Sequence, residues 1–180
     1  MHDPTVLRAI AHPVRNRILG ELTAQGSLRA ADIARELGIP ANQASFHLRQ
    51  LAKYGLVEED PEAARDKRDR VWRATSPDGL TISLEEVEGA PGGKAASRVF
   101  RTQAAARSRD LVDAAYGDVR EPGTHRAVMD HTVRLTEDEA RELSTDITDV
   151  LEKWAERTRD RAPGRRTYSL LAILQPLPPP

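Results

Sequence analysis

The sequence contains no cysteine among its 180 residues. This absence excludes disulfide bonds, thiolate metal sites and cysteine nucleophiles together. Aromatic residues are also scarce, at 4%, so a core has to be built mainly from Ala, Leu, Ile and Val. No apolar run approaches the roughly 20 residues that cross a bilayer. The opening MHDPTVLRAI lacks the basic and apolar regions of a secretion signal. We therefore expect a soluble cytoplasmic protein without a membrane partner.

Charge of one sign does not dominate either. The chain has 27 Lys and Arg against 28 Asp and Glu, which gives a formal net charge of -1. The two halves differ little, with 12 basic and 10 acidic residues in 1–75, and 15 basic and 18 acidic residues in 76–180. A surface that attracts nucleic acid must therefore come from the local arrangement of basic side chains.

Motifs of catalysis and metal binding are missing as well. No Gly-rich phosphate loop follows a predicted strand, and no nucleophile motif frames the Ser, His and Asp residues. Asp130 and His131 would point to opposite faces of a strand, so they cannot share a metal. The five histidines are scattered along the chain at positions 2, 12, 47, 125 and 131. We expect a protein that is not an enzyme and needs no metal or cofactor.

The first half of the chain has helical periodicity. A short helix to about Ala11 and a second helix over Pro13–Ala24 are separated at His12-Pro13, because proline disfavours helix in the residue before it. Ser27 is expected to cap a third helix that ends at Gly38. That helix has an inward face of Ala30, Ile33, Ala34 and Leu37.

A fourth helix and a β-hairpin follow. The helix is predicted over Pro40–Tyr54 and ends before Gly55. Residues 56–59 and 70–74 read as two strands around a charged loop, which predicts a hairpin, and Trp72 is expected to pack in its second strand. One further strand is expected at Leu80–Leu84.

The second half is predicted as a long helix and a strand–helix–strand region. The helix covers Lys94–Tyr116, and alternating residues predict a strand over Ala127–Leu135. Thr136 with Glu139 forms a capping box for the next helix. Its apolar stripe and a final, more buried strand over Thr167–Gln175 are expected to form a small second core. The stripe consists of Leu143, Ile147, Val150, Leu151 and Trp154. The fold class is thus α+β, mainly α, with one domain over 1–80 and a C-terminal region over 81–180.

The helix over Pro40–Tyr54 has an unusual outward face. Ala44, Leu48 and Leu51 form its inward stripe, and no acidic residue occurs between Ala41 and Leu56. Amides, hydroxyls and cations are the groups that bind base edges and phosphates, whereas glutamate would be repelled by phosphates. A short helix, a tight turn and such a second helix predict a helix-turn-helix that enters the major groove of double-stranded DNA. The candidate DNA contacts are Asn42, Gln43, Ser45, Phe46, His47, Arg49, Gln50 and Lys53.

Two of these residues have an alternative role. His47 lies near the boundary of the inward stripe and could instead cap the core, and Phe46 could pack on a neighbouring subunit instead of touching a thymine methyl group. The loop of the hairpin adds cations that can lie on the phosphate backbone, although Asp66 and Asp69 are interleaved with them. These cations are Arg65, Lys67, Arg68 and Arg70.

The segments VLRAIAHPVRNRILGEL, ADIARELGIPANQASFHLRQLAKYGLVEE and VWRAT together resemble the ArsR-type (ArsR/SmtB-like) winged helix-turn-helix regulators over about residues 5–80. The resemblance rests on the spacing of Ala34, Gly38, Ser45, His47-Leu48, Leu51 and Gly55-Leu56-Val57. It implies a homodimer that binds an operator and represses or otherwise controls transcription. The chain departs from the metal-sensing members, which carry cysteine or clustered histidine and carboxylate ligands. The C-terminal hundred residues are similar to those of extended members of the family.

The function of the C-terminal region stays open between dimerisation and the binding of an unknown small-molecule effector. The residues expected to line an effector pocket are Met129, His131, Val133, Trp154, Tyr168 and Leu170. We expect the N-terminal helices and the long helix over Lys94–Tyr116 to form the dimer. The alternative to a DNA-binding regulator is a winged-helix protein-interaction module that does not bind DNA.

Overall fold

The computed structural model describes residues 3–65, 70–77, 83–159 and 162–177. Its first two helices begin at prolines, and the start of the second at Pro13 is the one that the sequence predicted. Helix α1 spans Pro4–Ala11 and helix α2 spans Pro13–Gln25. His12 between them is extended, which is the conformation that a following proline favours. Gly26 ends α2 with a φ of 79°.

The next two helices form the helix-turn-helix. Helix α3 spans Ala30–Leu37 and helix α4 spans Ala41–Lys53. The prediction that Ser27 caps α3 is wrong. A two-residue strand β1, Leu28–Arg29, precedes the helix, and Arg29 occupies the capping position. The Ser27 hydroxyl instead donates a hydrogen bond to the Asp60 carboxylate at 2.5 Å.

The predicted hairpin is present and forms the wing. Strand β2 spans Val57–Glu59 and strand β3 spans Val71–Ala74, and they pair antiparallel with Glu58 opposite Arg73. Strand β1 adds to the other side of β3, so the sheet order is β1-β3-β2. A short 3-10 helix, η1, spans Pro61–Ala63. Trp72 is buried, as predicted.

One apolar core joins these elements and extends past residue 80. Leu7, Ile18, Leu48 and Leu56 are among its fully buried side chains. Helix α5 spans Leu84–Gly89 and helix α6 spans Gly93–Tyr116, and both add residues to the same core, namely Val87 and Ala96. The expected strand at Leu80–Leu84 is therefore wrong at its last residue, where α5 begins. Residues 80–82 lie outside the described part of the chain.

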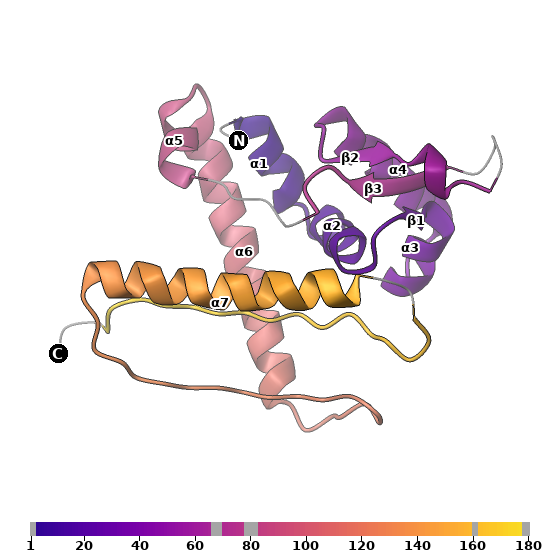
Figure 1. Cartoon of the computed structure of the whole chain (residues 1–180). Coiled ribbons are helices and arrows are strands. Elements are labelled where there is room, and N and C mark those ends of the chain that lie inside the picture. Colours follow the sequence, from indigo (N-terminus) through magenta and orange to yellow (C-terminus); the bar gives the residue numbers. More distant parts are fainter. Residues whose placement is uncertain (1–2, 66–69, 78–82, 160–161, 178–180) are drawn as a thin grey trace.

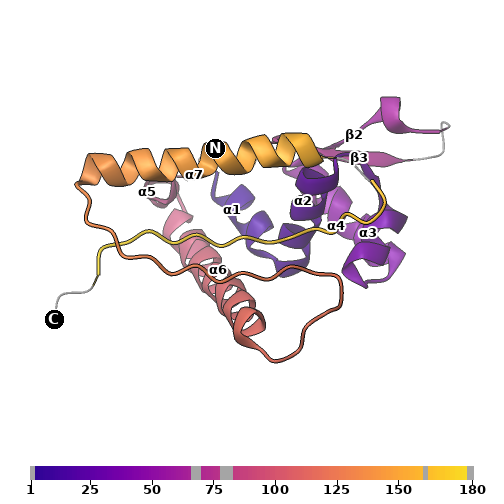
Figure 2. The same cartoon turned by 60° about the horizontal axis from the view of Figure 1, so that its bottom comes forward.

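The C-terminal region stands away from that core. Helix α6 extends from α1 and α5, and its buried residues, Gly93, Ala96 and Ser97, all lie in its first two turns. Helix α7, Glu137–Thr158, begins with the predicted capping box of Thr136 and Glu139 and reaches α2 at its far end. Figure 2 shows the wing and the C-terminus at opposite ends of the molecule.

The strands predicted at Ala127–Leu135 and Thr167–Gln175 are wrong for this structure. Both segments run as extended chain along α7 (Figure 1), but neither is paired in a sheet among the described residues. The part of the C-terminal region that the structure describes does not form the expected second core either, because α7 has no buried residue. Alternating side chains favour an extended backbone, whereas a strand also needs a partner about 4.8 Å away. The described part of one chain does not supply that partner.

The architecture is a mainly helical α+β fold with an N-terminal winged helix-turn-helix. Within the described residues, no helix combines the length and the apolar character that crossing a membrane requires.

Candidate nucleic-acid interface

Helix α4 has the two faces that its sequence predicts. Ala44, Leu48 and Leu51 are fully buried against the rest of the winged helix. Asn42 and Arg49 are exposed on the opposite side. Lys53 is exposed as well, and the remaining polar candidates of the helix, Gln43, Ser45 and Gln50, are partly exposed on its flanks. The polar groups are thus presented to solvent by a helix whose other side is anchored in the core.

The turn before α4 fixes the direction of this helix. Gly38 adopts the left-handed conformation with a φ of 63°, which glycine tolerates better than other residues. The backbone N–H of Ile39 then donates to the carbonyl of Ala34 at 3.0 Å, which closes the end of α3. Pro40 precedes the first turn of α4 with an extended backbone.

The electrostatics of the outward face are one-sided. Helix α4 contains no acidic residue, and neither Arg49 nor Lys53 forms a salt bridge with any described residue. A cation without an internal partner is available to an external anion. The face therefore presents amide, hydroxyl and cationic groups, which suits phosphates and base edges.

His47 does not belong to this outward face, although it was predicted as a DNA contact. Its side chain is 5% exposed, and its ring packs against His12 with centroids 4.8 Å apart. Burial, with the charges of His12 and Arg15, lowers the pKa of His47. A neutral, buried ring supports the position of α4 from behind, which is the alternative that the sequence left open. Phe46 is 50% exposed and lies edge-on to His47 at 5.3 Å.

Two of the cations on the wing are paired with carboxylates of the same chain. Arg70 and Arg73 form ion pairs with Glu59 and Glu58, at 3.6 Å and 2.8 Å respectively. All four side chains are largely exposed, so water screens both pairs and a phosphate can compete for the arginines. Arg65 is exposed at the start of the loop. The predicted contacts Lys67 and Arg68 lie outside the described residues.

Asp60 holds the base of the wing, a role that the sequence did not indicate. It is buried, and its carboxylate accepts hydrogen bonds from the Ser27 hydroxyl and from the backbone N–H of Glu62 at 3.2 Å. The Ser27 hydrogen bond is the main reason why the pKa of Asp60 lies below its ordinary value. Since Ser27 precedes β1, this contact ties the wing to the helix-turn-helix.

Arg15 has a second supporting role that was not predicted. Its guanidinium donates to the carbonyl oxygens of Ala9 at 2.6 Å and of Arg8 at 3.1 Å. These carbonyls belong to the last turn of α1, where helical partners are missing. An Arg shortly after a helix-ending His-Pro was the only available signal in the sequence.

The structure does not bring the predicted effector residues together around a cavity. Met129 is 72% exposed and Trp154 is 54% exposed, and His131, Val133, Tyr168 and Leu170 are exposed as well. None of the six lines the cavity between α2, the base of the wing and α6. Their role as an effector pocket stays a prediction. Among the described residues, no three His, Asp or Glu side chains lie where they could hold a metal ion together.

Comparison with protein families matches residues 10–60 to the family described as "Helix-turn-helix domain". This range contains α3, the turn and α4. No curated protein matches the chain in sequence. Among solved structures, a double mutant of ZitR from Lactococcus lactis in apo form is 17% identical, covers 80% of this chain and 83% of its own, and has a TM-score of 0.34. NMB1585, a MarR family regulator from Neisseria meningitidis, is 22% identical, covers 84% of this chain and 76% of its own, and has a TM-score of 0.32.

Proposed function

We propose that this protein is a sequence-specific DNA-binding transcriptional regulator, acting as a homodimeric repressor of the ArsR type. One observation carries the proposal: α4 presents an exposed face without acidic residues on a rigidly anchored helix. In a helix-turn-helix, that face enters the major groove. The family match over residues 10–60 supports the same function.

The proposed contacts divide into two groups. Asn42, Gln43, Ser45 and Gln50 read base edges from α4, with Phe46 available for a thymine methyl group, while Arg49 and Lys53 bind bases or phosphates. Arg65 and Arg70 bind phosphates from the wing. The release of counterions by these cations makes the affinity strongly dependent on salt.

Exposed apolar side chains and unpaired extended segments in the single chain support a homodimer. Val150 and Trp154 of α7 are about half exposed, and the extended segments beside α7 are unpaired. Helix α1 is already covered by the α6 of the same chain, because Val6, Leu7 and Ile10 are buried in the common core. We therefore place the dimer contacts on α7 and the far part of α6. A two-fold dimer would set two α4 helices one DNA turn apart, about 34 Å, on a palindromic site.

The test begins by selecting bound fragments from genomic DNA and measuring affinity for the recovered site. Arg49→Ala should weaken binding by about 1–3 kcal/mol, because it removes a charged contact in the groove. Arg98→Ala is the matched control, since Arg98 is exposed in the first turns of α6, outside both α4 and the proposed dimer contacts. Fluorescence anisotropy at several salt concentrations gives the affinities and the salt slope.

The competing function is a protein-interaction module. The ion pairs that occupy Arg70 and Arg73 favour it, because they reduce the positive charge of the wing. If no fragment is retained at low salt, or if Arg49→Ala binds as tightly as the wild type, α4 does not read DNA and this module becomes the better assignment.

A further inference from the structure

A cavity of about 420 Å³ lies outside the proposed DNA interface. It lies between α2, the base of the wing and α6. Leu19, Leu56 and Phe100 form the apolar part of its wall. This volume is in the range of small-molecule sites.

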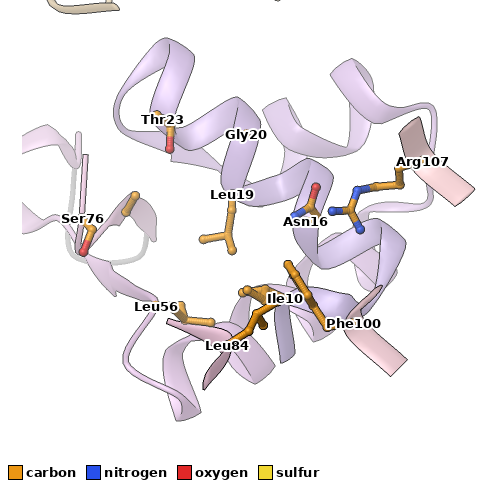
Figure 3. A pocket seen from close by; sticks show the side chains of 11 residues that line it. Ile10, Asn16, Leu19, Gly20, Thr23, Leu56, Ser76, Leu84, Phe100 and Arg107 are labelled. Carbon is orange, nitrogen blue, oxygen red and sulfur yellow. The ribbon is translucent and has the colours of Figure 1, made fainter. Parts of the chain in front are cut away.

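Arg107 is the one charged residue among the eleven that line this cavity. Figure 3 shows its guanidinium pointing toward the amide of Asn16, while Ser76 lies at the opposite end. Nη1 of Arg107 is buried and has no hydrogen-bond partner among the described residues. Burial of a guanidinium nitrogen without a partner is costly, so this atom is a strong recognition element for an acceptor.

The chemistry of the walls selects the ligand. A guanidinium binds a carboxylate through parallel N–H···O hydrogen bonds, and an amide such as Asn16 can donate to the same group. A phosphate dianion carries two negative charges, whereas the cavity offers one cation, so a monocarboxylate is the better match in charge. The apolar walls of Leu19, Leu56 and Phe100 suit a hydrocarbon body attached to the acid.

We propose that this cavity binds a small organic monocarboxylate with an apolar body, whose carboxylate pairs with Arg107 beside Asn16. The hydrocarbon part lies against Leu19, Leu56 and Phe100. Burial lowers the pKa of Arg107 from its ordinary value, and a bound carboxylate would stabilise the charged guanidinium in return.

The position of the cavity gives the ligand a structural role. Asn16 and Leu19 belong to α2, which packs against α4, and Ser76 follows the second strand of the wing. Arg107 belongs to α6. A ligand therefore touches the base of the wing, the helix that packs against α4, and the helix that leads to the C-terminal region.

The test uses the full-length protein without DNA, so its failure is separate from a failure of the proposed function. The probes are 3-phenylpropanoate and its neutral isostere 3-phenylpropanamide, titrated by isothermal calorimetry. The carboxylate should bind in a saturable manner and about tenfold or more tightly than the amide, as expected for a hydrogen bond to a charged group. Arg107→Gln should remove this preference, and Arg107→Lys should retain part of it.

Arg109→Gln is the matched control, because Arg109 lies two residues along α6 on the exposed side. It should bind the carboxylate as the wild type does. Circular dichroism of each variant verifies that it is folded. Equal binding of acid and amide, a preference that persists in Arg107→Gln, or no saturable binding in the millimolar range would each overturn the assignment.

Discussion

His12 and His47 form a pair of polar side chains behind the exposed face of α4. Their rings are in contact, and Nδ1 of each ring is buried without a hydrogen-bond partner among the described residues. Burial is the main reason why the pKa of each histidine is lowered, and the charge of Arg15 acts in the same direction on both. The pair is therefore built to be neutral, and protonation would place charge next to Arg15 behind α4.

This arrangement predicts that acid destabilises the fold near neutral pH. The unfolded histidines, with a pKa of about 6.5, take up protons before the folded ones do, so the free energy of unfolding falls as the pH drops below about 6.5. Urea unfolding at about pH 7.5 and about pH 5.5 measures the difference. Asp60 does not contribute in this window, because its lowered pKa matters only below its unfolded value of 3.8.

The double variant His12→Asn/His47→Asn should lose most of that pH difference, whatever its stability at neutral pH. His125→Asn is the control, because His125 is exposed and its removal should leave the pH difference unchanged. A double variant with the full pH difference would contradict the assignment to this pair.

At the scale of elements, the junction of α5 and α6 decides how the long helix leaves the core. Gly92 is left-handed with a φ of 77°, and its carbonyl accepts a hydrogen bond from Arg8 of α1 at 3.4 Å. An ion pair between Arg101 and Glu88 at 3.0 Å crosses the same junction. Gly93 begins α6 so close to α5 that a Cβ atom there would lie 1.7 Å from the carbonyl oxygen of Val87.

Gly93→Ala should therefore destabilise the protein by about 1–3 kcal/mol, because the backbone of α5 has to move to make room. The urea midpoint measures the change. Gly89→Ala is the matched control, since a Cβ atom at Gly89 meets nothing within 4 Å. It should be neutral or stabilise by up to about 1 kcal/mol through the unfolded state. Similar midpoints for the two variants would show that the junction is not tightly packed.

At the scale of the whole molecule, the chain exposes more surface than a compact monomer does. Its accessible surface is 13046 Å² for a mass of 19.9 kDa. A folded monomer of this mass exposes about 8,700 Å², so about 4,300 Å² is in excess. Obligate homodimers bury about 2,000–5,000 Å² of surface in total, counted over both chains. Burying half of the excess surface of each chain would reach this range. The surface area supports the proposed dimer.

The apolar stripe of α7 is the part of that surface where a substitution is most informative. Val150→Glu should weaken the dimer by at least about tenfold, because a buried charge without a partner is costly. Val150 is 53% exposed in one chain, so the monomer itself should tolerate the change. Sedimentation velocity over a concentration series measures the dissociation constant.

Thr145→Glu adds the same charge on the opposite side of α7 and should leave the dimer intact. If both variants behave as the wild type does, the dimer contacts lie elsewhere. A wild-type protein that stays monomeric at every concentration would argue against the proposed homodimer itself.

Local sequence patterns predicted the helices and the wing because their causes are local. Prolines at the starts of α1 and α2, Gly38 after α3 and the Thr136–Glu139 capping box act within a few residues of one another. The outward face of α4 follows from helical periodicity in the same way. Helix α5 was missed because its boundary depends on Ser83 capping Glu86, in a short junction where strand and helix signals overlap.

Long-range contacts account for the predictions that were wrong or incomplete. Ser27 had the composition of a helix cap, but Asp60, 33 residues later, accepts its hydroxyl hydrogen bond instead. Helical geometry placed His47 at the boundary between the apolar and polar faces of α4. Its ring is in the core because it packs against His12, a contact that the sequence does not show. Arg107 carried a weak signal, since it lies seven residues after Phe100 on the same face of α6, but the cavity that both line requires α2 and the wing.

The sequence by itself determined the approximate positions of α1 to α4, α6 and α7, which side of α4 is apolar, and that the other side has no acidic group. These properties depend on periodicity and on contacts between near neighbours in the chain. Only the tertiary structure decided that His47 is buried, that Asp60 anchors the wing, and that Arg107 faces a cavity. It also decided that the extended segments beside α7 are unpaired, because pairing and enclosure depend on surfaces that chain folding brings together from distant positions.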